Sequence, residues 1–108
     1  MEFEEIVQRA LDSLPPEFSP ALENLEIAVE DEPPPGQRVF GIYHGVPLTE
    51  RGDRVGLLPD RIVIFQGPLE RAFRDPAELE QQIRITVLHE LAHYFGIDED
   101  RLDELGYA

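Results

Sequence analysis

The sequence predicts a single domain that combines α-helices with a few short β-strands. Helical periodicity marks both ends of the chain, and segments rich in β-branched and aromatic residues lie between them. A chain of 108 residues buries roughly 65% of its extended surface on folding, which is enough for one hydrophobic core. We therefore expect one domain over residues 1–108.

The first half of the chain predicts one helix and two strands. In residues 3–14 the apolar positions recur at i, i+3, i+4 and i+7, which predicts an amphipathic helix that ends at a pair of prolines. Residues 25–30 (LEIAVE) predict a strand, and residues 31–36, with three consecutive prolines, predict a loop. Residues 39–44 (VFGIYH) are rich in β-forming residues and predict a second strand.

The clearest strand pattern is residues 61–66 (RIVIFQ), after a stretch punctuated by Gly and Pro, residues 45–59, that predicts a loop. The apolar residues of this strand do not alternate with polar ones, so both of its faces should be covered. Gly67-Pro68 should end the strand.

The last long element is a helix with clear start and stop signals. Asp75 can cap it, Pro76 suits the first helical position, and Glu78 stands where a capping box has its carboxylate. Nothing interrupts the helix before Gly96, a natural stop. The acidic residues 98–105 predict a short second helix.

Composition excludes several classes of function. The chain has no Cys, so disulfides, thiolate metal sites and cysteine nucleophiles are absent, and any metal must be held by His, Asp or Glu. Arg supplies all 9 positive charges and the net charge is −14, which argues against nucleic-acid and membrane partners. The acidic N-terminus does not resemble a secretory signal, and no apolar run approaches the ~18 residues of a membrane span. We expect a cytoplasmic protein.

The C-terminal helix contains His89-Glu90-Leu91-Ala92-His93, an H-E-x-x-H sequence. Residues four apart lie on one face of a helix, about 6 Å apart along its axis, so two imidazoles can converge on one ion. Glu90 lies about 60° around the helix from His93, which suits a base for metal-bound water better than a ligand.

The setting of this motif favours a metal site over a chance match. Between Val87 and Phe95 the only polar groups, apart from a Tyr hydroxyl, belong to the motif, and Gln82 and Thr86 continue the polar stripe. Two imidazoles and a carboxylate in an apolar setting are costly unless they are paired or bind metal. The alternative is a helix with two partly exposed histidines and an ordinary surface glutamate.

A catalytic zinc ion needs a third protein ligand and one open position. Gly96 could turn the chain back toward the ion, and the residue ten positions after the first His is Glu99. Asp98 is its closest rival, Asp103 and Glu104 are further candidates, and a ligand from elsewhere stays open. The alternative for this acidic cluster is a solvated helix end.

The third and last histidine, His44, lies next to Tyr43 near a predicted strand end. One interpretation is an ordinary surface residue. The other places Tyr43 or His44 across a cleft from the motif helix, where either could stabilise an oxyanion or orient substrate. Tyr94 and Tyr107 are comparable candidates for that role.

Four segments carry a resemblance to a known family: residues 41–48 (GIYHGVPL), 60–68 (DRIVIFQGP), 86–96 (TVLHELAHYFG) and 101–107 (RLDELGY). With them the chain resembles the small bacterial zincin-like metallopeptidases, a family with a minimal metallopeptidase fold that was formerly a domain of unknown function. The resemblance implies an α+β, minimal zincin-like fold, in which a small twisted sheet packs on the HExxH helix.

The resemblance also implies one Zn²⁺ per chain at His89 and His93, with Glu90 as the catalytic acid and base. The motif is similar to that of the metzincins, which have His or Asp where this chain has Glu99 and a Met-turn beneath the site. Met1 is the only methionine here, so we expect no Met-turn. Because few residues follow the motif, we also expect a cleft without the C-terminal wall of large zincins.

These observations predict a zinc-dependent metallopeptidase that hydrolyses peptide bonds through a zinc-activated water, with Glu90 as general base. The edge of the strand at residues 41–44 could pair with an extended peptide or an unfolded protein. We expect a monomer or a small homo-oligomer.

Two alternative functions stay open. The first is a zinc-binding zincin-like module with little or no proteolytic turnover that acts through a partner. The second is a zinc endoribonuclease with a His-x-x-x-His helix. It is disfavoured because this chain has Glu99 where such enzymes have a third His, and its negative charge opposes phosphate binding.

Overall fold

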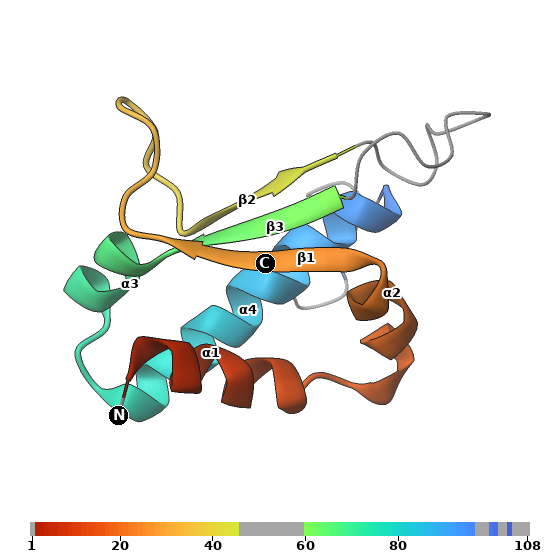
Figure 1. The fold of residues 1–108 in the computed structure, drawn as a ribbon, viewed down its shortest axis with the longest axis horizontal. Helices are drawn as coiled ribbons and strands as arrows, with labels where there is room; N and C mark the ends of the chain where they lie inside the picture. The colour runs from red at the N-terminus through yellow and green to blue at the C-terminus, as the bar shows by residue number, and fades with distance from the viewer. Residues whose placement is uncertain (1, 46–59, 97–99, 102–103, 105–108) are drawn as a thin grey trace.

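The computed structural model describes residues 2–45, 60–96, 100–101 and 104, and shows an α+β fold in which helices pack against a small sheet (Figure 1). This confirms the predicted fold class. The elements, in chain order, are α1 (Phe3–Asp12), the 3-10 turn η1 (Pro16–Phe18), α2 (Ser19–Glu23), β1 (Leu25–Glu30), β2 (Gly41–His44), β3 (Asp60–Phe65), α3 (Gln66–Ala72) and α4 (Pro76–Phe95).

The sheet has three strands in the order β1-β3-β2. The central strand β3 pairs in parallel with β1 and antiparallel with β2, where Gly41 lies opposite Ile64 and His44 opposite Arg61. Residues 62–65 of β3 are at most 1% exposed, which confirms that this strand is covered on both faces. Because β3 is central, β2 lies at an edge of the described sheet.

Helix α1 ends two residues earlier than predicted, at Asp12, and its amphipathic pattern is confirmed. Its buried face packs with α4 and the sheet in one hydrophobic core. At the edge of this contact, Arg9 forms an ion pair with Glu80 of α4 (2.8 Å). Helix α1 thus packs against α4, the helix that carries the H-E-x-x-H motif.

The predicted ends of α4 are confirmed. The side chain of Asp75 accepts a hydrogen bond from the backbone N–H of Glu78 (3.1 Å), and Pro76 is the first helical residue. Gly96 follows the helix with a left-handed φ of 80°, and its N–H donates to the carbonyl of His93 (3.0 Å). Helix α4 therefore continues through the whole H-E-x-x-H motif.

The clearest difference from the prediction follows β3. The strand occupies residues 60–65 rather than 61–66, and Gln66 begins helix α3, which the sequence did not predict. Gly67-Pro68, predicted only to end the strand, lies in the first turn of this helix, where proline is tolerated. The short helix α2 was also not predicted, and the second strand begins at Gly41 rather than at residue 39.

An exposed ion pair connects α3 to the loop after β1. Arg71 donates two hydrogen bonds to the carboxylate of Glu32, each 2.9 Å long. The hydrogen bond from Arg71 lowers the pKa of Glu32, and the hydrogen bond to Glu32 raises the pKa of Arg71.

Most of the predicted loop 45–59 lies outside the described residues. In the acidic tail, residues 100, 101 and 104 are helical, and the rest of the predicted second helix also lies outside them.

Within the described residues, no helix is both long enough and apolar enough to cross a bilayer.

Strand β2 lies very close to helix α4 at Gly41. A Cβ atom there would lie 2.8 Å from the methyl group of Thr86 and 3.0 Å from the carbonyl oxygen of Val63. Both distances are shorter than a normal van der Waals contact, so the spacing between strand and helix requires a residue without a side chain.

Replacing Gly41 with Ala should therefore lower the free energy of unfolding by about 1–3 kcal/mol, the usual effect of overpacking a core. Urea denaturation measures this change. The double variant Gly41→Ala/Thr86→Ser lacks the clashing methyl and should recover part of the loss, whereas the contact with Val63 persists. A Gly41→Ala protein as stable as wild type would contradict this account.

Candidate metal centre

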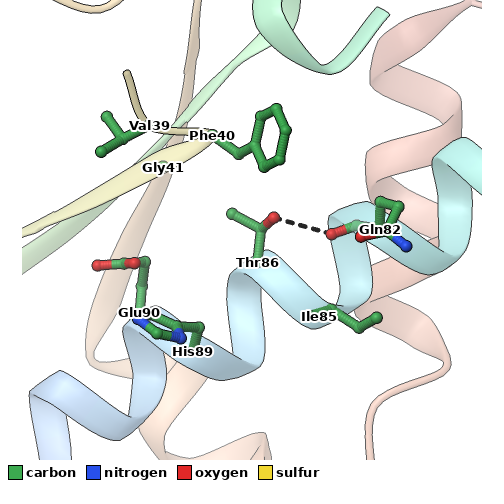
Figure 2. Close-up of a pocket in the computed structure, with 8 residues that line it drawn as sticks. All are labelled: Val39, Phe40, Gly41, Gln82, Ile85, Thr86, His89 and Glu90. Atoms are coloured by element: carbon green, nitrogen blue, oxygen red, sulfur yellow. Dashed lines mark hydrogen bonds between the residues drawn. The ribbon is translucent and has the colours of Figure 1, made fainter. Parts of the chain in front are cut away.

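Helix α4 brings His89, Glu90 and His93 together. One potential ligand atom from each lies within 4.8 Å of the others, and the two imidazole rings are 5.0 Å apart between centroids at an angle of 67°. Both histidines are half-buried, and Glu90 is 9% exposed. In Figure 2, Glu90 and His89 lie side by side on α4, and the Glu90 carboxylate points toward β2.

The carboxylate of Glu90 is held by the backbone of β2. The N–H of Tyr43 donates a hydrogen bond of 2.9 Å to Oε1 of Glu90. A largely buried carboxylate is costly unless it is hydrogen-bonded, so this contact helps Glu90 to keep its position. The sequence singled out Tyr43 as a residue that could stabilise an oxyanion or orient substrate, whereas its contact with Glu90 is made by the main chain.

The side chain of Tyr43 is anchored at a second point. Its hydroxyl donates to Oδ2 of Asp60 (2.7 Å), and its ring contacts the ring of Tyr94 edge to face, with centroids 6.1 Å apart. Asp60 is only 6% exposed. Sequence reasoning assigned no role to Asp60, although this residue begins the segment 60–68 that contributes to the family resemblance.

A cavity of about 330 Å³ adjoins His89 and Glu90, between α4 and the start of β2 (Figure 2). Its lining is largely apolar and consists of Val39, Phe40, Gly41, Gln82, Ile85, Thr86, His89 and Glu90. Phe40, at 37% exposure, contacts the ring of Phe73 with centroids 5.6 Å apart. Because His89 and Glu90 form part of the wall, a group in the cavity would lie next to one of the two predicted metal-binding histidines and to the predicted general base.

The structure does not describe every residue that the sequence singled out. Glu99 and Asp98, the candidate third ligands, lie outside the described residues, as do Asp103 and Tyr107. Glu104 is described and forms an ion pair with Arg101 (2.8 Å). The third ligand therefore stays a prediction.

His44 is exposed at the end of β2. Successive side chains of a strand point to opposite faces of the sheet, so His44 lies on the face opposite to Tyr43. It does not belong to the described group of three potential ligands.

The chemistry of these three side chains fits a divalent metal ion. Two imidazoles with a carboxylate nearby form a donor set that suits zinc and admits other divalent ions. Their partial burial limits competition from solvent, and both histidines come from one rigid helix.

The comparisons with known proteins agree with this geometry. A family model described as "Zincin-like metallopeptidase" matches residues 22–107, which include all three residues of the group. Among solved structures, a conserved hypothetical protein from Thermo thermophilus has the same fold. Its TM-score is 0.58 and its identity is 24%, over 87% of this chain and 91% of that one. No curated protein matches the sequence significantly.

Replacing His89 with Ala should remove one of the two imidazoles and weaken Zn²⁺ binding by more than the ~10–100-fold loss typical of an outer-shell partner. Isothermal titration calorimetry and elemental analysis measure affinity and stoichiometry. His44→Ala is the matched control and should leave the affinity unchanged. Equal losses in the two variants, or none in His89→Ala, would show that the metal binds elsewhere.

Proposed function

The chain belongs to the zincin-like metallopeptidase family, and from this premise we propose that it is a zinc-dependent peptidase. The observation that carries the proposal is the position of the Glu90 carboxylate. It lies within 4.8 Å of both imidazoles, in the wall of a cavity large enough for a side chain. A general base is needed at such a position, beside the metal and open to substrate.

His89 and His93 would hold the zinc ion, with Glu99 as the proposed third ligand and Asp98 as its rival. When bound, zinc supplies a Lewis acid for the scissile carbonyl and lowers the pKa of a coordinated water toward ~7. Glu90 would accept a proton from the attacking water and deliver it to the leaving amine. The Tyr43 amide would keep the Glu90 carboxylate in place during both transfers.

The edge of β2 would bind the substrate backbone. The N–H of Tyr43 points to Glu90 rather than to β3, and alternation in an antiparallel ladder gives Gly41 the same outward orientation. An extended peptide can pair with the outward groups of Gly41. Of the two candidates, this placement favours Tyr43, because His44 lies on the other face of the sheet, and Tyr43 would act indirectly by holding Glu90.

The adjoining cavity supports a preference for an apolar side chain next to the scissile bond. Phe40 and Ile85 line it together with the methyl-bearing Thr86, and pockets of this kind bind apolar groups.

The net charge of −14 favours basic residues elsewhere in the substrate through long-range attraction. The Cys-free composition is compatible with the expected cytoplasmic location.

Replacing Glu90 with Gln should reduce peptide cleavage by about 10²–10⁴-fold, the usual contribution of a general base. The carboxamide oxygen can still accept the Tyr43 N–H, so the fold and zinc content should be preserved. Cleavage of fluorogenic peptides and elemental analysis measure the two properties. Glu78→Gln makes the same change of charge in the first turn of α4 and should be without effect.

If zinc-loaded wild type cleaves no peptide and no unfolded protein, the peptidase proposal is wrong. The binding of zinc without turnover would then favour the second function, a metal-binding module that acts through a partner.

Replacing Ile85 with Trp should fill the cavity and lower kcat/KM by about 10–200-fold for peptides with a large apolar residue beside the scissile bond, the range expected for a change in apolar pocket contacts. Peptides with Gly at that position should lose less. A peptide library with one varied position measures the difference. Gln81→Trp adds the same ring at an exposed position of α4 and serves as the control.

A further inference from the structure

We propose that Asp60 is a positioning residue for Glu90 and acts on it through Tyr43. The inference rests on the proposed peptidase function for its kinetic consequence, but the contacts that carry it are independent of that function. Asp60 belongs to neither the metal-binding group nor the wall of the cavity. It is nevertheless one of the few buried carboxylates among the described residues.

The first step is the contact between Asp60 and Tyr43. A buried carboxylate must be stabilised by hydrogen bonds, and Oδ2 of Asp60 accepts one from the Tyr43 hydroxyl at 2.7 Å. The chain also packs closely around this carboxylate. A Cβ atom at Gly45 would lie 2.5 Å from Cγ of Asp60 and 2.8 Å from the Tyr43 hydroxyl. The lack of a side chain at Gly45 therefore leaves room for the hydrogen bond between Tyr43 and Asp60 at the end of β2.

The second step is the effect on the main chain of β2. The strand has four residues and, in the described sheet, pairs on one side with β3. The Tyr43 side chain fixes the position of this short edge strand at two places, through its hydroxyl at Asp60 and through its ring against Tyr94. Both places lie on elements of the buried core, since Asp60 begins β3 and Tyr94 is 5% exposed on α4.

The third step leads from Tyr43 to Glu90. A glutamate side chain has three rotatable bonds, and the 2.9 Å hydrogen bond from the Tyr43 N–H selects among its rotamers. A misplacement of about 1 Å can reduce a catalytic rate by about 100-fold, so the position of this amide matters. Two hydrogen bonds therefore connect the Asp60 carboxylate to the Glu90 carboxylate. One is made by the Tyr43 hydroxyl and the other by the Tyr43 N–H.

The test compares Tyr43→Phe, Asp60→Ala and Asp60→Asn. The first removes only the hydroxyl, the second removes the acceptor, and the third keeps an oxygen that can accept. For Tyr43→Phe and Asp60→Ala we expect kcat to fall by about 10–100-fold while KM changes by less than about twofold. Asp60→Asn should recover most of the kcat lost in Asp60→Ala. Zinc affinity should be the same in all three variants.

A second readout does not depend on activity. Hydrogen exchange of the residue 43 amide, measured by NMR without substrate, should be protected in wild type and faster by at least about tenfold in Tyr43→Phe and Asp60→Ala. Glu90→Ala, which removes the acceptor, should show the same acceleration. The Ile42 amide is the internal control, because alternation directs it toward β3 and its protection should persist.

Three outcomes would overturn the proposal. The first is an unprotected Tyr43 amide in wild type, and the second is an exchange rate of this amide that is the same in wild type and in Asp60→Ala. The third is equal acceleration of the amides of residues 42 and 43, which would show that Asp60 only stabilises the strand. If the exchange results are as expected but wild type cleaves no peptide, the positioning role stands and the peptidase function fails.

Discussion

The hydrogen bond from the Tyr43 amide to the Glu90 carboxylate is the contact on which the rest of the site depends. A carboxylate that is 9% exposed needs a donor, and here the donor comes from the main chain of a strand. Such a contact requires the backbone of β2 to lie very close to α4, which explains the lack of a side chain at Gly41. The geometry of the site is therefore set by the distance between sheet and helix, with the buried strand β3 as the support for β2.

Much of the fold could be predicted because its signals are local. Asp75 and Gly96 determine the ends of α4 through hydrogen bonds to residues within one turn, and residues 25–30 have the composition of a strand. Helix α3 could not be predicted in the same way. Gly67-Pro68 reads as an interruption in the sequence, although proline is compatible with the first turn of a helix once the preceding strand has ended.

The site was predictable only in part, because some of its contacts join residues that are far apart in the sequence. The convergence of His89 and His93 follows from a spacing of four residues on one helix. The partner of Glu90 lies 47 residues away in the sequence and contributes a backbone atom, which no residue type reveals. Asp60 likewise acquires its significance only when β2 and β3 are placed side by side. The third metal ligand lies beyond these arguments and stays a prediction.

Strand β2 also bears on how copies of this chain behave toward one another. An open strand edge can serve as a template on which strands of other molecules add, the first step of aggregation. Here the edge is four residues long, and its Tyr43 amide is already bonded to a carboxylate. An incoming strand would find the Tyr43 donor occupied and could pair along β2 only with the outward groups of Gly41, the short pairing proposed for a substrate. The arrangement that holds Glu90 in place thus also discourages intermolecular sheet growth from this side of the molecule.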